Sequence, residues 1–196
     1  NAAYGVSATS NIDMGIRDAG GTQSFSIYGL LRVNAGYFST RESGGLIQWS
    51  ESAGQVEIHG GVVDAKQFRT AGSSGGLTSY TQTGGVFELR GRFRRVPTSY
   101  TSVTDLIAAP INTNRETGGL NGAVATLNIS EEENVFNMSG GTIRIFDVCG
   151  DGSAAEQQKA IEIYSSSNNI NVSGGTVEFL PTAGGTGTDS PNFRVI

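Results

Sequence analysis

Two stretches near the C-terminal end decide the fold: residues 134–145 read NVFNMSGGTIRI and residues 168–179 read NNINVSGGTVEF. They align without a gap, and seven of the twelve positions are identical or exchange one aliphatic residue for another. On each side of the glycine pair apolar and polar residues alternate, as Ile143 does with Thr142 and Arg144. A period of two is typical of a β-strand that buries one face. We therefore expect a strand, a sharp corner at the glycines, where positive φ is needed, and a second strand in a new direction.

The same frame recurs upstream, which makes it an internal repeat. Its copies lie at residues 31–38, 56–63 and 80–89. If the second glycine of the pair is the marker, the copies fall at Gly36, Gly61, Gly85, Gly141 and Gly175, in steps of 25, 24, 56 and 34 residues. We interpret the step of 56 as two periods with an insertion and the step of 34 as one period with a longer loop. A second marker, Gly-Gly-Leu, opens residues 44–46, 75–77 and 118–120.

Short strands, tight corners and a period near 25 residues favour an all-β parallel β-helix, a solenoid whose coils stack about 4.8 Å apart. A β-sandwich is the competing fold, but it gives no reason for a fixed repeat. We expect residues 1–196 to form one β-helix segment of about six to eight coils, with a long loop insertion around 96–117 and a shorter one around 147–159. From the two ends of the sequence we expect a piece of a longer chain, and a mature N-terminus after removal of a signal peptide is the alternative for its start. The predicted structural corner glycines are Gly60, Gly61, Gly84, Gly85, Gly140, Gly141, Gly174 and Gly175.

Stacked coils predict columns of like side chains in the core. One predicted column contains Ile58, Met138 and Val172, and another contains Phe38, Val63, Phe87, Ile143 and Val177. Each fully buried side chain of this kind contributes roughly 1.5 to 3 kcal/mol.

Composition excludes several classes of function. Glycine makes up 29 of 196 residues, the net charge is -5, and there is one His and one Cys. An acidic chain without a basic stripe argues against nucleic acid as a partner. A single His and a single Cys exclude sites that need two His ligands or several Cys ligands. No apolar run is long enough for a membrane span, and we expect neither a metal nor a cofactor.

The leading candidate for a ligand site is a local patch of arginines and an aromatic residue that leads into the longer insertion. It consists of Arg90, Arg92, Arg94, Arg95 and Tyr100. A solvated loop is the alternative interpretation. His59, the only imidazole, occupies the polar position just before the corner, so we interpret it as a solvent-facing turn residue.

Other polar features carry weaker predictions. Glu131–Glu133 and the stretch from Asp147 to Asp151 match no calcium-loop motif and are interpreted as solvated turn acids. Cys149 is expected to be a small buried or corner residue. Three Asn-x-Ser triplets begin at residues 128, 137 and 171, and the last two follow from the repeat frame.

The run at 168–179, its copies and the Gly-Gly-Leu openings resemble right-handed parallel β-helix regions of very large surface proteins of Bacteroidota, the gliding-motility adhesins and related cargo of the type IX secretion system. The resemblance implies a secreted, extracellular segment at the cell surface, without catalytic residues. It also implies neighbouring coils of a longer parent chain as partners, together with surface glycans or the secretion and motility machinery.

Two classes of function follow as hypotheses. The first is a structural and adhesive module that binds surfaces or glycans without catalysis. The alternative is a β-helix polysaccharide lyase or glycoside hydrolase, or a tailspike-like glycan-binding protein, which should show charged or aromatic residues at outward positions of consecutive coils. The outward positions beside the best corners read as a mixture without a clear cluster: Glu57, Thr81, Glu88, Asn137, Arg144, Asn171 and Glu178. We therefore favour the adhesive module and expect no enzyme.

Overall fold

A computed structural model describes most of the repeat copies. The described residues are 3–6, 11–13, 24–39, 46–49, 54–70, 78–91, 94–95, 111–112, 125–129, 131–148, 159–180 and 192–195. Within these ranges the chain is all-β, apart from the three-residue 3-10 helix η2 (Ser167–Asn169). The prediction of an all-β chain is thus confirmed for the described part.

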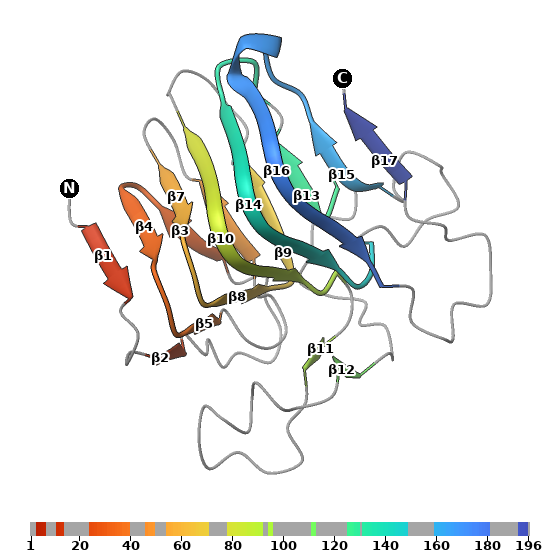
Figure 1. Ribbon diagram of the computed structural model, residues 1–196. Helices are drawn as coiled ribbons and strands as arrows, with labels where there is room; N and C mark the ends of the chain where they lie inside the picture. Colours follow the sequence, from red (N-terminus) through yellow and green to blue (C-terminus); the bar gives the residue numbers. More distant parts are fainter. Residues whose placement is uncertain are drawn as a thin grey trace.

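The first sheet contains the repeat copies, and its strands are parallel (Figure 1). Six of its strands follow one another in the order β1 (Ala3–Val6), β4 (Leu30–Val33), β7 (Gln55–Ile58), β10 (Ser79–Leu89), β14 (Val135–Ile145) and β16 (Ile170–Phe179). Three short strands, β2 (Asn11–Asp13), β5 (Tyr37–Ser39) and β8 (Val62–Ala65), continue this sheet beside the second half of β10. Each of the long strands β10, β14 and β16 therefore covers the length that two short strands, such as β7 and β8, cover in an earlier copy.

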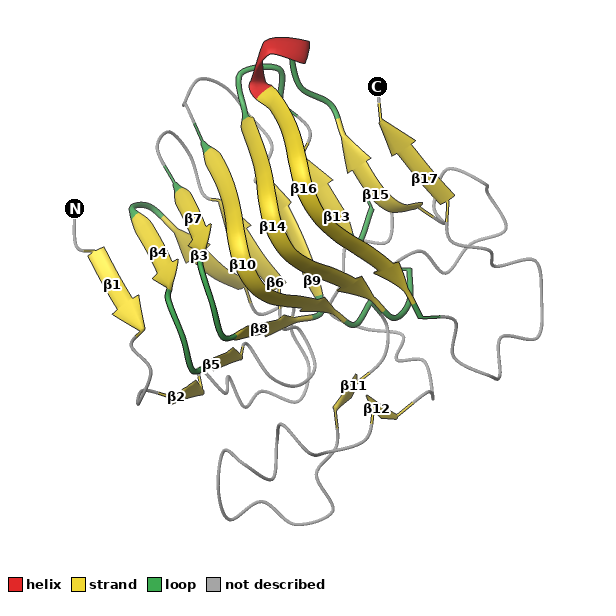
Figure 2. Ribbon diagram, viewed as in Figure 1, coloured by secondary structure: helices red, strands yellow, loops and turns green. Residues whose placement is uncertain are grey.

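A second sheet lies behind the first (Figures 1 and 2) and is also parallel. Its order is β3 (Ser24–Ile27), β6 (Leu46–Trp49), β9 (Gln67–Thr70), β13 (Leu127–Ile129), β15 (Lys159–Ile163) and β17 (Asn192–Val195). The chain alternates between the two sheets, so each strand pairs with the corresponding strand of the preceding repeat copy. A separate antiparallel pair joins β11 (Arg94–Arg95) to β12 (Ile111–Asn112).

The step of 56 residues between Gly85 and Gly141 is one repeat, and its interpretation as two periods is wrong. β14 pairs directly with β10 on both sides of the corner. The extra residues lie between Leu89, where β10 ends, and Leu127, where β13 begins. A stacked repeat tolerates such a loop because its strands keep their neighbours. Most of the predicted insertions at 96–117 and 147–159 lies outside the described residues.

Both predicted columns are present in the register of the first sheet. Phe38, Val63, Phe87, Ile143 and Val177 occupy successive partner positions. Ile58, Met138 and Val172 also share a column, which includes Val33 and Gln82 as well. Side chains of the second sheet close the core from the opposite side. The ring of Phe68 on β9 lies 5.7 Å from the ring of Tyr80 and 5.5 Å from that of Phe87.

Gln82 is a polar residue within this core column and is fully buried. Its Nε2 donates to the carbonyl oxygen of Thr142 at 3.2 Å, and its Oε1 accepts from the hydroxyl of Tyr80 at 2.8 Å. Burial raises the pKa of Tyr80 well above its ordinary value, so this hydroxyl stays protonated and remains a donor. Since the amide is satisfied on both sides, Gln82 fixes the corner of β14 relative to β10.

The glycine pair is required by close approach as well as by backbone angle. Gly141 has φ of 81°, in the region that L side chains disfavour. A Cβ atom on Gly140 would collide with the carbonyl oxygen of Thr83, and one on Gly174 would lie 2.6 Å from that of Ser139. Each corner therefore stacks backbone against backbone on the corner before it.

Candidate functional site

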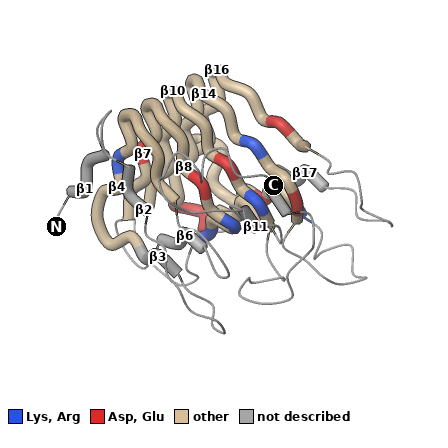
Figure 3. The backbone as a smooth tube through the Cα atoms, turned by 90° about the horizontal axis from the view of Figure 1, so that it is seen from below, with Lys and Arg blue, Asp and Glu red and all other residues tan. Residues whose placement is uncertain are grey.

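The most extensive polar feature of the described residues is a row of side chains that we call the charged row. It occupies successive partner positions across five strands: Ser39, Asp64, Glu88, Arg144 and Glu178. Each member follows directly after a member of the core column that runs from Phe38 to Val177. Because neighbouring residues of a strand point to opposite faces, the charged row lies on the face turned away from the core. Figure 3 shows these charges on neighbouring strands, ending at β16.

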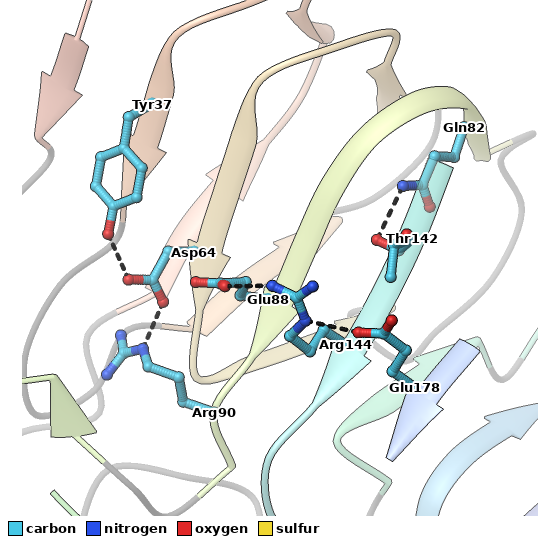
Figure 4. A network of polar contacts seen from close by, with 8 residues as sticks. All are labelled: Tyr37, Asp64, Gln82, Glu88, Arg90, Thr142, Arg144 and Glu178. Carbon is cyan, nitrogen blue, oxygen red and sulfur yellow. Dashed lines mark hydrogen bonds and ion pairs between the residues drawn. The ribbon is translucent and has the colours of Figure 1, made fainter. Parts of the chain in front are cut away.

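Arg144 joins two carboxylates of the charged row (Figure 4). Its Nε donates to Glu178 Oε2 at 2.8 Å, and its Nη1 donates to Glu88 Oε1 at 3.1 Å. The hydrogen bond with Glu178, followed by that with Glu88, raises the pKa of Arg144 further above its ordinary value. Arg144 therefore stays charged and ties three consecutive strands together.

Asp64 is held by two partners in a buried setting. Arg90 Nε donates to Asp64 Oδ1 at 2.5 Å, and the hydroxyl of Tyr37 donates to Asp64 Oδ2 at 2.6 Å. All three side chains are buried. Buried ionised groups persist only when they are paired and hydrogen-bonded, and this pair meets that condition. Lys66 is a further buried charged side chain two residues from Asp64.

The pairing limits what the charged row does chemically. Asp64, Glu88 and Glu178 each accept a hydrogen bond from an arginine. A glycoside hydrolase needs one carboxyl group that gives up a proton and another that attacks or activates water. In the charged row each of these three carboxylates is bound to a guanidinium group.

The sequence-predicted arginine patch is divided by the structure. Arg90 is fully buried and paired with Asp64, away from the surface on which a ligand site was expected. Arg94 and Arg95 lie on β11, opposite Asn112 and Ile111 of β12, and only their backbone is described. Arg92 and Tyr100 lie outside the described residues. The ligand-binding role of this group stays a prediction.

His59 lies at an exposed corner, as its place in the repeat predicts. Its Nδ1 is 2.7 Å from Thr83 Oγ1, and its Nε2 is 3.1 Å from Glu57 Oε2. Arg32 Nε donates to the same Glu57 oxygen at 2.6 Å. The hydrogen bond from Arg32 is the main reason that the pKa of Glu57 is lowered. The matching positions before the other corners, Asn34, Thr83, Ser139 and Ser173, are exposed too.

The remaining polar candidates form no site among the described residues. Glu132 and Glu133 are exposed, and no group of three His, Cys, Asp or Glu side chains in the described part is placed to hold a metal ion. Asn128, which begins one of the Asn-x-Ser triplets, is buried and donates to Glu162 Oε2 at 3.2 Å. Cys149 and Asp151 lie outside the described residues.

The conclusion that the outward charges lack a cluster is wrong. Glu88, Arg144 and Glu178 are partners in adjacent strands, and Asp64 continues the same row. The signal was present in the sequence, because each of these residues stands three positions after the second glycine of its corner. Within a single copy the outward positions are a mixture of polar residues, and the row appears only when the copies are stacked.

Comparison of the chain with protein-family models, curated proteins and solved structures gives no match. In the described part of the chain, no helix has the length and apolar character that a membrane crossing requires.

Proposed function

We propose that this chain is a segment of a right-handed parallel β-helix that serves as a structural and adhesive part of a large secreted cell-surface protein, without catalysis. The two parallel sheets, in which strand order follows the repeat copies, support the β-helix. The resemblance to gliding-motility adhesins and type IX secretion cargo supports the surface location and the secretion or motility machinery as partners. Neighbouring coils of a longer parent chain complete the set of partners.

The observation that carries the non-catalytic proposal is the pairing within the charged row. An enzyme groove along one face requires outward carboxylates that reach a substrate. Here the buried Asp64 is bound by Arg90 and Tyr37, while Arg144 holds Glu88 and Glu178. This use of charge stabilises a stack of strands, which is the requirement of a rod.

The stacking is tested by engineered disulfides between facing positions of neighbouring strands. Thr81 and Asn137 are register partners, whereas Thr81 and Asn171 are two strands apart. With Cys149 replaced by Ala, the pair T81C and N137C should cross-link on mild oxidation, because partner Cα atoms lie within the range that a disulfide spans. The pair T81C and N171C is the matched control. Equal cross-linking of both pairs would contradict the stacked arrangement.

Adhesion is proposed to use the arginines in and next to β11 to bind anionic glycans, since a guanidinium donates in a fork that fits carboxylate and sulfate groups. The test compares binding to a glycan array before and after combined replacement of Arg92, Arg94 and Arg95 by Ala. We expect at least a tenfold loss for acidic glycans. The control is R32A, which removes an exposed arginine elsewhere on the first sheet. Unchanged binding in the triple variant would remove these arginines from the proposal.

The second candidate function is a polysaccharide lyase or glycoside hydrolase of the β-helix type. It is favoured by one observation, the presence of charged residues at the same outward position of four consecutive strands. Incubation with acidic polysaccharides and measurement of new reducing ends or unsaturated products distinguishes the two candidates. Turnover that is lost in E88Q and retained in E57Q would favour the enzyme, and absence of turnover in the wild type favours the adhesive segment.

A further inference from the structure

In the described part of the chain, β16 is the strand at one end of the first sheet. β14 pairs with β10 on one side and β16 on the other, whereas the pairing of β16 is with β14 alone. Among the described residues, the backbone N–H and C=O groups on the outer side of β16 therefore have no strand partner in this sheet, at whose end Figure 1 draws this strand. Such an edge is a template for another strand.

The core columns also end at β16 with apolar side chains in solvent. Val172 is 61% exposed and Val177 is 38% exposed. Their column neighbours on β14, Met138 and Ile143, are 2% and 0% exposed. The two valines belong to the inward-facing columns, so their exposure reflects the missing neighbour on one side and not a change in orientation.

The charged row adds an electrostatic requirement at the same edge. Its last member, Glu178, shares Arg144 with Glu88, so the described part of the row contains more carboxylates than guanidinium groups. A basic residue at the next partner position would pair with Glu178 as Arg144 does. An acidic residue there would face Glu178 directly, which is unfavourable for cross-strand neighbours.

This requirement disfavours a second copy of the chain as the occupant. The free strand edge at the other end of the first sheet consists of β1 and β2. Asp13 of β2 is the register partner of Ser39, so it continues the charged row at that end of the sheet. Head-to-tail stacking of two copies in this register would place Asp13 opposite Glu178, which brings two like charges together.

We propose that the free edge of β16 accepts one further parallel strand that has the repeat frame of β14, with apolar residues continuing the columns of Val172 and Val177 and a basic residue opposite Glu178. The inference rests on the proposed function, in which neighbouring coils of the parent chain are partners. It specifies what the next coil must contain. Main-chain hydrogen bonds supply affinity in this mode of strand addition, and the side chains set the register.

The test uses a synthetic peptide with the sequence of residues 134–146, which provides the frame and the basic residue at the required position. Fluorescence anisotropy measures its binding to the whole chain, and hydrogen exchange maps protection. We expect saturable binding, with new protection confined to amides of 170–179. A peptide in which Arg is replaced by Glu should bind at least tenfold more weakly, and a scrambled peptide of the same composition should not bind.

Variants of the chain assign the discrimination to Glu178. In E178Q the Arg and Glu peptides should bind equally well, because the charge that separates them is absent. E57Q, which removes a carboxylate from the interior strand β7, should keep the tenfold difference. Failure of the Arg peptide to bind, or protection elsewhere than at β16, would overturn the proposal.

Two further measurements separate the possible failures. Concentration-dependent association of the wild-type chain in analytical ultracentrifugation that becomes stronger in E178Q, where the charge opposite Asp13 is removed, would show a second copy at the edge and overturn the choice of occupant. Peptide binding at β16 requires no glycan. A glycan array without binding therefore contradicts the adhesive function alone, and the peptide experiment tests the edge of β16 independently.

Discussion

β14 and β16 share one sequence frame but occupy different places in the sheet. Their residues pair in register on both sides of the corner, from Phe136 with Ile170 to Ile145 with Phe179, with an irregularity at the corner itself. The same apolar positions are buried in β14, whereas in β16 Val172 and Val177 are exposed and Ile170 and Phe179 are only partly buried. The frame therefore determines the path of the chain and its register, whereas the energy of burial depends on whether a strand has neighbours on both sides.

The comparison is tested most strongly by truncating equivalent core residues. I143A should lower the free energy of unfolding by about 2 to 5 kcal/mol, because it removes buried contacts and leaves a cavity between two strands. V177A, in the same column, should cost less than about 1 kcal/mol, since that side chain is 38% exposed. Denaturant unfolding followed by circular dichroism measures both. Equal losses would show that β16 is covered in solution.

In contrast to truncation of core residues, substitution of a corner glycine should lower the free energy of unfolding in both strands. In G140A and G174A the new methyl group meets a carbonyl oxygen of the preceding corner, that of Thr83 or Ser139. The neighbour that causes the clash is present in both cases, so we expect losses of about 1 to 3 kcal/mol for each variant. S139A, at the exposed position beside the corner, is the control and should be close to neutral. A neutral G174A would mean that the last corner is not stacked on the one before it.

These contrasts also explain which features were accessible from the sequence. The column from Phe38 to Val177 was predictable because the glycine pair sets a common frame, and alternation then fixes which residues face inward. The register of Gly85 with Gly141 was misjudged because spacing counts residues in loops as well as in strands. An insertion between β10 and β13 changes the spacing and leaves the strand pairing unchanged.

The charged row was only partly predictable for a different reason. The residue types at Glu88, Arg144 and Glu178 were visible as outward positions, but their pairing depends on which strands are neighbours. The pairing of Asp64 with Arg90 could not be predicted, because Arg90 lies past the end of β10 and approaches Asp64 only when the strands are stacked. The repeat frame predicts which residues face outward, but their contacts depend on which strands are neighbours in three dimensions.

The two sides of Arg144 provide a smaller test of interior against edge. R144M should destabilise the chain by about 1 to 2 kcal/mol, because the substitution leaves the largely buried Glu88 without its bridging guanidinium. This value is kept low because the Arg144 side chain is partly exposed to solvent. E178Q should cost less, because the Glu178 side chain is 38% exposed. Chemical denaturation with urea at low and at high salt measures both effects. The loss in E178Q should decline more with added salt than the loss in R144M. The same salt response in both variants would contradict the difference between interior and edge.

The smallest effect is expected at Glu57, which lies on an interior strand but outside the core. Its hydrogen bond from Arg32 lowers its pKa, so the folded state holds the ionised form more firmly than the unfolded state does. The stabilisation is therefore present above the ordinary pKa of glutamate, about 4.3, and is lost as the pH falls through the lower folded-state pKa. Urea unfolding of wild type and E57Q should give a small difference at pH 7 that disappears in acid. A difference that grows on acidification would contradict the predicted direction of the pKa shift of Glu57. A large difference at pH 7 would show that even a partly exposed charge on an interior strand is strongly stabilising.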